Sequence, residues 1–291
     1  MRHILHFTFK RIVFVVFLFP FALFAQNDTL SYFRLKTVSE NIGFNFLTLT
    51  DPYLSPLEYS GNGLNYNHSS RRFLFDNNTR LSRENRSSLL IGMLYNPTST
   101  ASMSVVQGTY SWGMHHHFYA SKNTHFLVGG NVNGMLGAKY IARNVNNPVN
   151  ADFAVNLNLS ALFRQNLSFG KFKCNLQLRA ESPVIGAMFV PPLGASYYEM
   201  FDVGSPNNAF HFSSFHNKFG LEYGLALFFP LRSSTLFVDI NKNSLLYQTD
   251  YATYTFDCLS VSIGWKYDLY IFAGTKKPAP RNFLSTDNFN L

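Results

Sequence analysis

A run of three histidines at positions 115–117 is the first feature of this chain that could do chemistry. Neutral imidazoles are common metal ligands. In an extended segment, however, successive side chains point to opposite faces, so His115 and His117 share one face and His116 lies on the other. The sequence offers no identifiable third ligand for the first two. We therefore interpret them as polar filling and predict no metal site.

The two cysteines and the known catalytic motifs give no further chemistry. Alternation along extended segments places Cys174 and Cys258 on opposite faces of their strands, which predicts two free thiols. The chain contains no Gly-x-Ser-x-Gly, His-Glu-x-x-His or Walker A pattern. We therefore assign no catalytic residue and no cofactor, although catalytic groups collected from separate strands would escape a search by spacing.

Charged side chains recur at alternate positions within otherwise regular segments. The same alternation predicts that they face the inside of a folded sheet, where both signs would form ion pairs or line a conduit. The residues predicted to face inward are Lys139, Arg164, Lys173, Arg179, Glu181, Lys218, Glu222, Asp239 and Lys266.

The elements that must position these groups are long strands. Apolar and polar residues alternate with period 2 over segments of about ten residues or more, longer than the strands of most soluble sandwiches. Aromatic residues make up 17% of the chain and charged residues only 14%, more rings than a soluble core readily hides. After residue 25 no apolar run is long enough for a helical membrane span. These features predict an all-β fold, a transmembrane antiparallel up-and-down barrel.

Turn residues divide the chain into about ten strands, an even number as bacterial barrels require. The break at residues 69–72 could be an extra turn, which leaves twelve strands as the alternative. Four connections are predicted to be short and periplasmic, at 82–85, 121–123, 169–170 and 231–233, and the longer ones extracellular. The predicted strands are 39–50, 62–82, 86–96, 102–120, 124–143, 150–168, 170–183, 209–230, 234–248 and 253–272.

Both ends of the chain have compositions unlike the strands. Residues 1–25 combine basic residues with an apolar stretch, which predicts a signal peptide cleaved after Ala25. Residues 26–273 would form the barrel, and residues 274–291 a polar periplasmic tail. The formal charge of +8 is scattered along the chain rather than clustered, so we expect no nucleic-acid partner.

The last predicted strand carries a pattern similar to the signal that the barrel-assembly machinery recognises in its clients. A polar residue, a glycine and two spaced apolar residues make up this pattern. They are Ser262, Gly264, Tyr267 and Leu269. The pattern is loose, but its place on the closing strand favours an interaction with this machinery during biogenesis.

Several loop segments have distinctive sequences. They read DPYLSPLEYSG at 51–61, RNVNNP at 143–148, SPVIGAMF at 182–189 and SYYEMF at 196–201. Together they resemble an uncharacterised Bacteroidetes family of outer-membrane β-barrels, domain of unknown function family 3316. The resemblance spans most of the mature chain and implies a barrel with no known activity.

All of these segments fall in connections assigned to the outside. Their prolines would stiffen the loops, and their tyrosines could cap the barrel mouth or contact a ligand. The candidate loop and ligand residues are Tyr53, Tyr59, Tyr197, Tyr198 and Glu199.

These features predict a noncatalytic barrel of the bacterial outer membrane. Its outer loops would cap the barrel or bind a small ligand or protein at the cell surface, and its exterior would contact outer-membrane lipid. One alternative is a narrow channel for small polar solutes, and a second is an enzyme that modifies outer-membrane lipids.

Overall fold

The computed structural model describes residues 33–75, 78–170, 172–204, 206–231, 234–249, 252–269 and 283–286. These residues form long antiparallel strands and two short helical segments. The barrel strands are β2 (Lys36–Asp51), β3 (Ser55–Phe75), β4 (Asn78–Tyr95), β5 (Ser102–Tyr119), β6 (Thr124–Tyr140), β7 (Val149–Phe169), β8 (Phe172–Phe189), β9 (Phe210–Ser214), β10 (Lys218–Pro230), β11 (Thr235–Thr249) and β12 (Ala252–Leu269).

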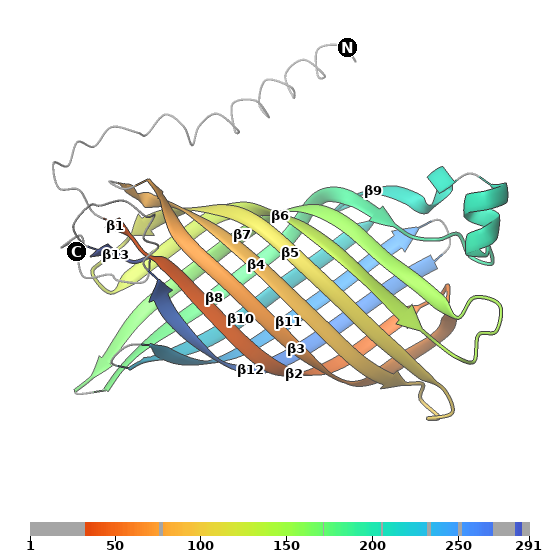
Figure 1. The fold of residues 1–291 in the computed structure, drawn as a ribbon, viewed down its shortest axis with the longest axis horizontal. Coiled ribbons are helices and arrows are strands. Elements are labelled where there is room, and N and C mark those ends of the chain that lie inside the picture. The colour runs from red at the N-terminus through yellow and green to blue at the C-terminus, as the bar shows by residue number, and fades with distance from the viewer. Residues whose placement is uncertain are drawn as a thin grey trace, which may run out of the picture.

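The strands close into a barrel (Figure 1). From β2 to β9 and from β10 to β12, each strand pairs with the next one along the chain, and β12 pairs with β2 over residues 255–269 and 36–50. Both β9 and β10 pair antiparallel with β8, so the two occupy one position, interrupted at residues 215–217. The part of the chain described here therefore makes a closed antiparallel barrel of ten strand positions.

The predicted all-β barrel is thus confirmed, and ten strands rather than twelve is the right number. The predicted short turn at 82–85 is wrong, because these residues lie within β4 and pair with β3. β3 continues without a break through residues 69–72, where Arg71 turns inward and pairs with Glu84 of β4. An internal ion pair, not a turn, interrupts the apolar pattern there.

The outside of the barrel is covered by apolar side chains. They occupy alternate positions of every long strand, and their exposed fractions in mid-strand are about 40–60%. An apolar surface of this extent is typical of a barrel that lies in lipid. Among these side chains are Phe44, Leu64, Ile91, Val106, Val132, Leu159, Leu225, Ile240, Val261 and Ile263.

The connections follow the predicted alternation of short and long only in part. Residues 52–54 alone join β2 to β3, and the segments 55–61 and 182–189 lie in β3 and β8 rather than in the predicted outer connections. The connections after β3, β5, β7 and β10 are short, and Gly170 adopts a positive φ of 63° in one of them. The longest connection, at the opposite end, joins β8 to β9 and contains the helical segments η2 (Glu199–Val203) and η3 (Pro206–Ala209) (Figure 1). The first and last barrel strands begin and end at the short-turn end, which the sequence assigns to the periplasm.

Residues from the two ends of the chain meet at that end. β1 (Phe33–Arg34) pairs in parallel with β13 (Phe283–Leu284), which belongs to the predicted tail. Ser285 and Thr286 are buried, and the hydroxyl of Thr286 lies 3.2 Å from that of Thr37 on β2. These tail residues therefore lie against the barrel rather than extending away from it.

The predicted signal peptide at residues 1–25 lies outside the described residues. In the described ranges, the structure has no helix with the length and apolar character needed to cross a membrane.

The closing seam can be tested with Val261→Pro. Val261 lies in mid-β12 and pairs with both β2 and β11, so proline removes a ladder hydrogen bond and leaves a backbone group unsatisfied, which costs several kcal/mol in lipid. We expect the unboiled protein to lose its compact band in a detergent gel. Val145→Pro is the control, because Val145 is 88% exposed in the β6–β7 loop. Unchanged migration of the Val261 variant would contradict the seam.

Candidate functional site

The half of the barrel interior away from the short turns, which the sequence assigns to the extracellular side, is filled by an apolar cluster, which we call the apolar plug. Its members project inward from seven strands or from the β2–β3, β6–β7 and β8–β9 connections, and each is at most 9% exposed. They are Leu47, Leu49, Tyr53, Leu54, Tyr59, Leu90, Leu94, Met103, Val105, Ile141, Ala154, Met188, Val190, Ala252, Tyr254, Phe256 and Cys258. Because apolar residues occupy both faces of the strands here, the expected contrast between an apolar outside and a polar inside is lost.

A buried ionic group lies among the plug residues near the outer end. The ammonium of Lys139 on β6 lies 2.9 Å from Asp51 and 2.8 Å from Asp152. The Asn150 amide donates to Asp51 over 2.8 Å. All four side chains are less than 10% exposed as whole residues. This group, which we call the polar lid, joins the ends of β2, β6 and β7.

The five loop candidates divide into two sets. Tyr53 and Tyr59 are buried in the plug, and half-buried Tyr197 packs against it. Tyr198 is 66% exposed, and Glu199 is also exposed at the start of η2. The first three thus help to close the mouth, whereas the last two face outward.

Hydrogen bonds hold the inner tyrosines in place. The Tyr53 hydroxyl donates to the Ala195 carbonyl over 2.9 Å, and its ring meets that of Tyr197 edge to face. The Ala151 amide donates to the Tyr197 hydroxyl over 2.7 Å. Burial raises the pKa of Tyr53 to about 12 and also raises the pKa of Tyr197, so both phenols stay protonated at neutral pH.

Glu199 has a local structural partner. The backbone amide of Ser196 donates to its carboxylate over 2.7 Å, and the Ser196 hydroxyl donates over 3.0 Å. These hydrogen bonds lower the pKa of Glu199. The carboxylate therefore orders the loop ahead of η2.

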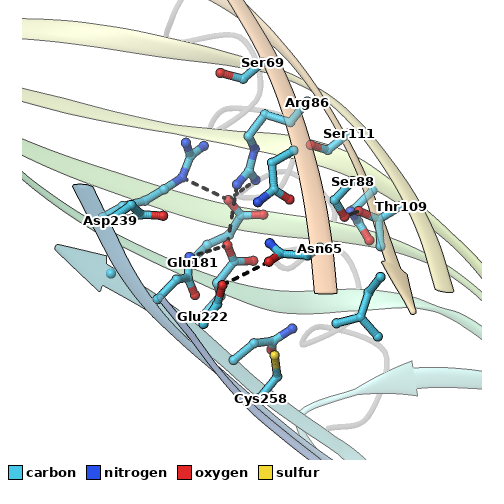
Figure 2. Close-up of a pocket in the computed structure, with 18 of the residues that line it drawn as sticks. Asn65, Ser69, Arg86, Ser88, Thr109, Ser111, Glu181, Glu222, Asp239 and Cys258 are labelled. Carbon is cyan, nitrogen blue, oxygen red and sulfur yellow. Dashed lines mark hydrogen bonds and ion pairs between the residues drawn. The ribbon is translucent and has the colours of Figure 1, made fainter. Parts of the chain in front are cut away.

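Below the plug the barrel encloses a polar cavity of about 310 Å³, which we call the lumen chamber (Figure 2). Asparagine, serine and threonine side chains from nearly every strand line it. Its lining reaches Phe228, Phe237 and Ser39, which lie near the periplasmic ends of their strands. The chamber thus extends from the plug toward the end that carries the short turns.

One side of the chamber is formed by an arginine–glutamate network. Arg86 lies 2.5 Å from Glu181 and 3.7 Å from Glu222, and these side chains point into the chamber together (Figure 2). Arg179 lies 2.8 Å from Glu84, which also binds Arg71 at 2.7 Å. The three arginines and three glutamates balance in charge and connect β3, β4, β8 and β10 across the interior.

A second hydrogen-bonded group lies closer to the periplasmic end. The Ser82 hydroxyl is 2.7 Å from Nε2 of His117, whose Nδ1 is 3.0 Å from Nε2 of His125. A serine, a base and an orienting group in this order resemble a nucleophile arrangement. However, Ser82 is fully buried and does not line the chamber, so the group lies apart from the chamber. The group fills the lumen, and His116 faces outward as expected.

Most of the inward charges were predicted correctly. Lys139, Arg164, Glu181 and Lys218 are buried inside, and Arg179, Glu222 and Asp239 line the chamber. Lys173 is instead exposed at the start of β8. The sequence reasoning missed Glu84 and Arg86 because of the misplaced turn at 82–85, and it missed Arg71 because residues 69–72 were interpreted as a break in the strand. The period-2 placement of Glu84 and Arg86 on one continuous strand could have found them.

The remaining predicted residues lie on β12 and β8. In the proposed assembly pattern, Ser262 is buried on the inner face, while Tyr267 and Leu269 lie near the end of β12. Cys174 and Cys258 are both buried and both free, as predicted.

The comparison with protein families identifies the chain. Residues 11–276 match the family described as protein of unknown function DUF3316. The chain belongs to this family. No curated protein matches it.

Several solved structures of outer-membrane proteins are similar to this DUF3316 protein. The outer-membrane protease OmpT of Escherichia coli has a TM-score of 0.45 at 7% identity, covering 83% of this chain and 99% of that one. The transport unit of the autotransporter AIDA-I from Escherichia coli gives 0.45 at 12%, covering 84% and 94%. The translocator domain of the autotransporter NalP from Neisseria meningitidis gives 0.41 at 11%, covering 83% and 90%.

The network can be tested with Glu84→Gln. The change leaves Arg71 and Arg179 without their shared carboxylate, and breaking a buried ion pair in this way costs about 3–5 kcal/mol. Denaturant unfolding of the protein refolded in lipid would measure the loss. Glu58→Gln, at an exposed position of β3, is the matched control. Equal stabilities of the two variants would contradict a structural role for the network.

Proposed function

We propose that this protein is a noncatalytic outer-membrane β-barrel that is closed toward the outside and holds a polar chamber that reaches toward the periplasmic end. The single observation that carries the proposal is the filling of the interior. The apolar plug and the polar lid occupy the extracellular half, where buried residues such as Leu49, Leu94 and Met103 have no exposed surface.

The closed mouth supports a role other than free diffusion. Water and small solutes would have to pass a cluster of tightly packed apolar side chains and then the Lys139 ion pairs. The loop between β8 and β9 covers the same end, and Tyr53 and Tyr197 attach it to the barrel. In this proposal the exposed Tyr198 and Glu199 are the loop positions available to a surface ligand or protein.

The apolar exterior supports a location in a membrane. Closed antiparallel barrels with such an exterior span the outer membrane of bacteria, which supports this particular membrane. In the same proposal residues 1–25 are cleaved after Ala25 during export. The assembly machinery recognises β12 through Ser262, Gly264, Tyr267 and Leu269. The distinctive loop segments favour a source in the Bacteroidetes.

A narrow channel is the second candidate, and the lumen chamber is the observation that favours it. The chamber is polar and continues toward the periplasmic end. A rearrangement of the plug would join it to the outside. In the arrangement described here, the plug separates the two.

Conductance separates the two candidates. We expect the refolded wild-type protein to be silent in a planar bilayer, because the plug blocks the lumen. The triple variant Leu94→Ala, Met103→Ala and Tyr254→Ala removes three side chains with at most 1% exposure and should open discrete conductance steps. The control removes three outward side chains: Val132→Ala, Leu159→Ala and Ile240→Ala. Wild-type conductance equal to that of the opened variant would favour the channel.

The membrane location gives a second test. Leu159 lies at the middle of β7 and is 63% exposed on the outside. Leu159→Arg should lower the free energy of unfolding in lipid by about 2–4 kcal/mol, since a charge at the bilayer midplane loses its hydration. Leu231→Arg, in the exposed turn after β10, should cost less than 1 kcal/mol by the same rule near the interface. Equal costs at the two positions would contradict the proposed placement.

A further inference from the structure

Lys218 is a buried cation of the lumen chamber that has no carboxylate partner. It is 5% exposed on β10, and its ammonium donates one hydrogen bond of 2.8 Å to Asn156. No ion pair among the described residues includes it, unlike Lys139 or Arg179. An ammonium removed from water without a counter-charge costs free energy. Two of its three donors remain available to a ligand.

Asn45 is a second, independent sign of a ligand in the same place. Its side chain is fully buried and lines the chamber, yet neither its amide nitrogen nor its amide oxygen has a partner within the described ranges. Buried amides are almost always hydrogen-bonded. An unpaired amide and an ammonium without a counter-charge, both lining one chamber, therefore point to a molecule that binds both.

The chain register places these groups at one level of the barrel. Three asparagines lie directly under the plug, each two positions along its strand from a plug residue or from a residue packed against the plug. They are Asn45, Asn156 and Asn243. Because Lys218 bonds to Asn156, its ammonium lies at this level too. The floor of the plug is thus lined by one cation and several amides.

We propose that this end of the lumen chamber binds a small monoanion that carries several hydroxyl groups, of the sugar-acid class. Lys218 receives the carboxylate, and the amide of Asn45 pairs with hydroxyls. An amide both donates and accepts, as a hydroxyl does, so a ring of asparagines suits a polyol better than an apolar ligand. The chamber volume of about 310 Å³ is at the small end of ligand pockets.

The negative groups of the chamber do not oppose such a ligand. Glu222 is held by Arg86 and accepts a hydrogen bond from Asn241. Asp239 lies opposite Ala226, eight positions along β10 from Lys218, roughly 26 Å at the rise of a strand. The anion would therefore meet the cation away from Asp239, while Arg86 neutralises Glu181 and Glu222.

Three probes with one carbon skeleton test the charge preference. Calorimetric titration of the refolded protein in detergent would use gluconate, neutral sorbitol and the cationic amine glucamine. We expect saturable binding of gluconate, at least roughly tenfold tighter than sorbitol, as a charged hydrogen bond allows, and no binding of glucamine. Equal affinity for gluconate and sorbitol, or no saturable binding of either, would overturn the proposal.

Variants then assign the preference to residues. Lys218→Met should reduce the affinity for gluconate to that for sorbitol, whereas Lys218→Arg keeps the charge and the preference. Asn45→Ala should weaken both probes. Lys122→Met, in the exposed β5–β6 turn, is the matched control. Heat-dependent gel migration reports whether each variant is folded. A folded Lys218→Met protein that still binds gluconate more tightly than sorbitol would contradict the role of Lys218. This result would be independent of the conductance measurements that test the proposed function.

Discussion

Backbone hydrogen bonding at the seam between β12 and β2 is the constraint on which the rest of this structure depends. A strand in lipid has no water to satisfy its amide and carbonyl groups, so every edge must be paired. Fifteen residue pairs between β12 and β2 meet this requirement. Once the ring is closed, its circumference is set, and inward side chains have to fill or line whatever space remains.

The interior is filled in layers of different chemistry. At the outer end the interior is filled by apolar packing. The ammonium of Lys139 is buried there and is neutralised by two carboxylates. Below it, amides line a space that they do not fill, and lower still arginines and glutamates neutralise one another. Most buried charges of the described residues are balanced by ion pairs, whereas the ammonium of Lys218 has no carboxylate partner there. A ligand with a negative charge can contribute binding energy at such a position without moving the fold.

The sequence was sufficient for the fold class because period-2 alternation survives wherever one face meets lipid, as along β7. It placed His115, His117 and Glu181 on the inner face correctly. It could not reveal the plug, since Leu47 and Leu49 lie inside while Phe44 and Phe46 lie outside, and hydropathy does not separate them. Nor could it pair Glu84 with Arg179, which are 95 residues apart and meet only because the sheet closes.

The parallel pairing of β1 with β13 has a consequence for the order of folding. These segments come from opposite ends of the chain, and a loop that long is costly to close in an open polypeptide. We expect the pairing of β2 with β12 to form first. It brings β1 and β13 close together, so that they can pair without closing a long loop. Ser285 and Thr286 can then enter the lumen mouth beside Thr37, so the docked tail records that the barrel has finished forming. It acts as a late latch on the periplasmic side.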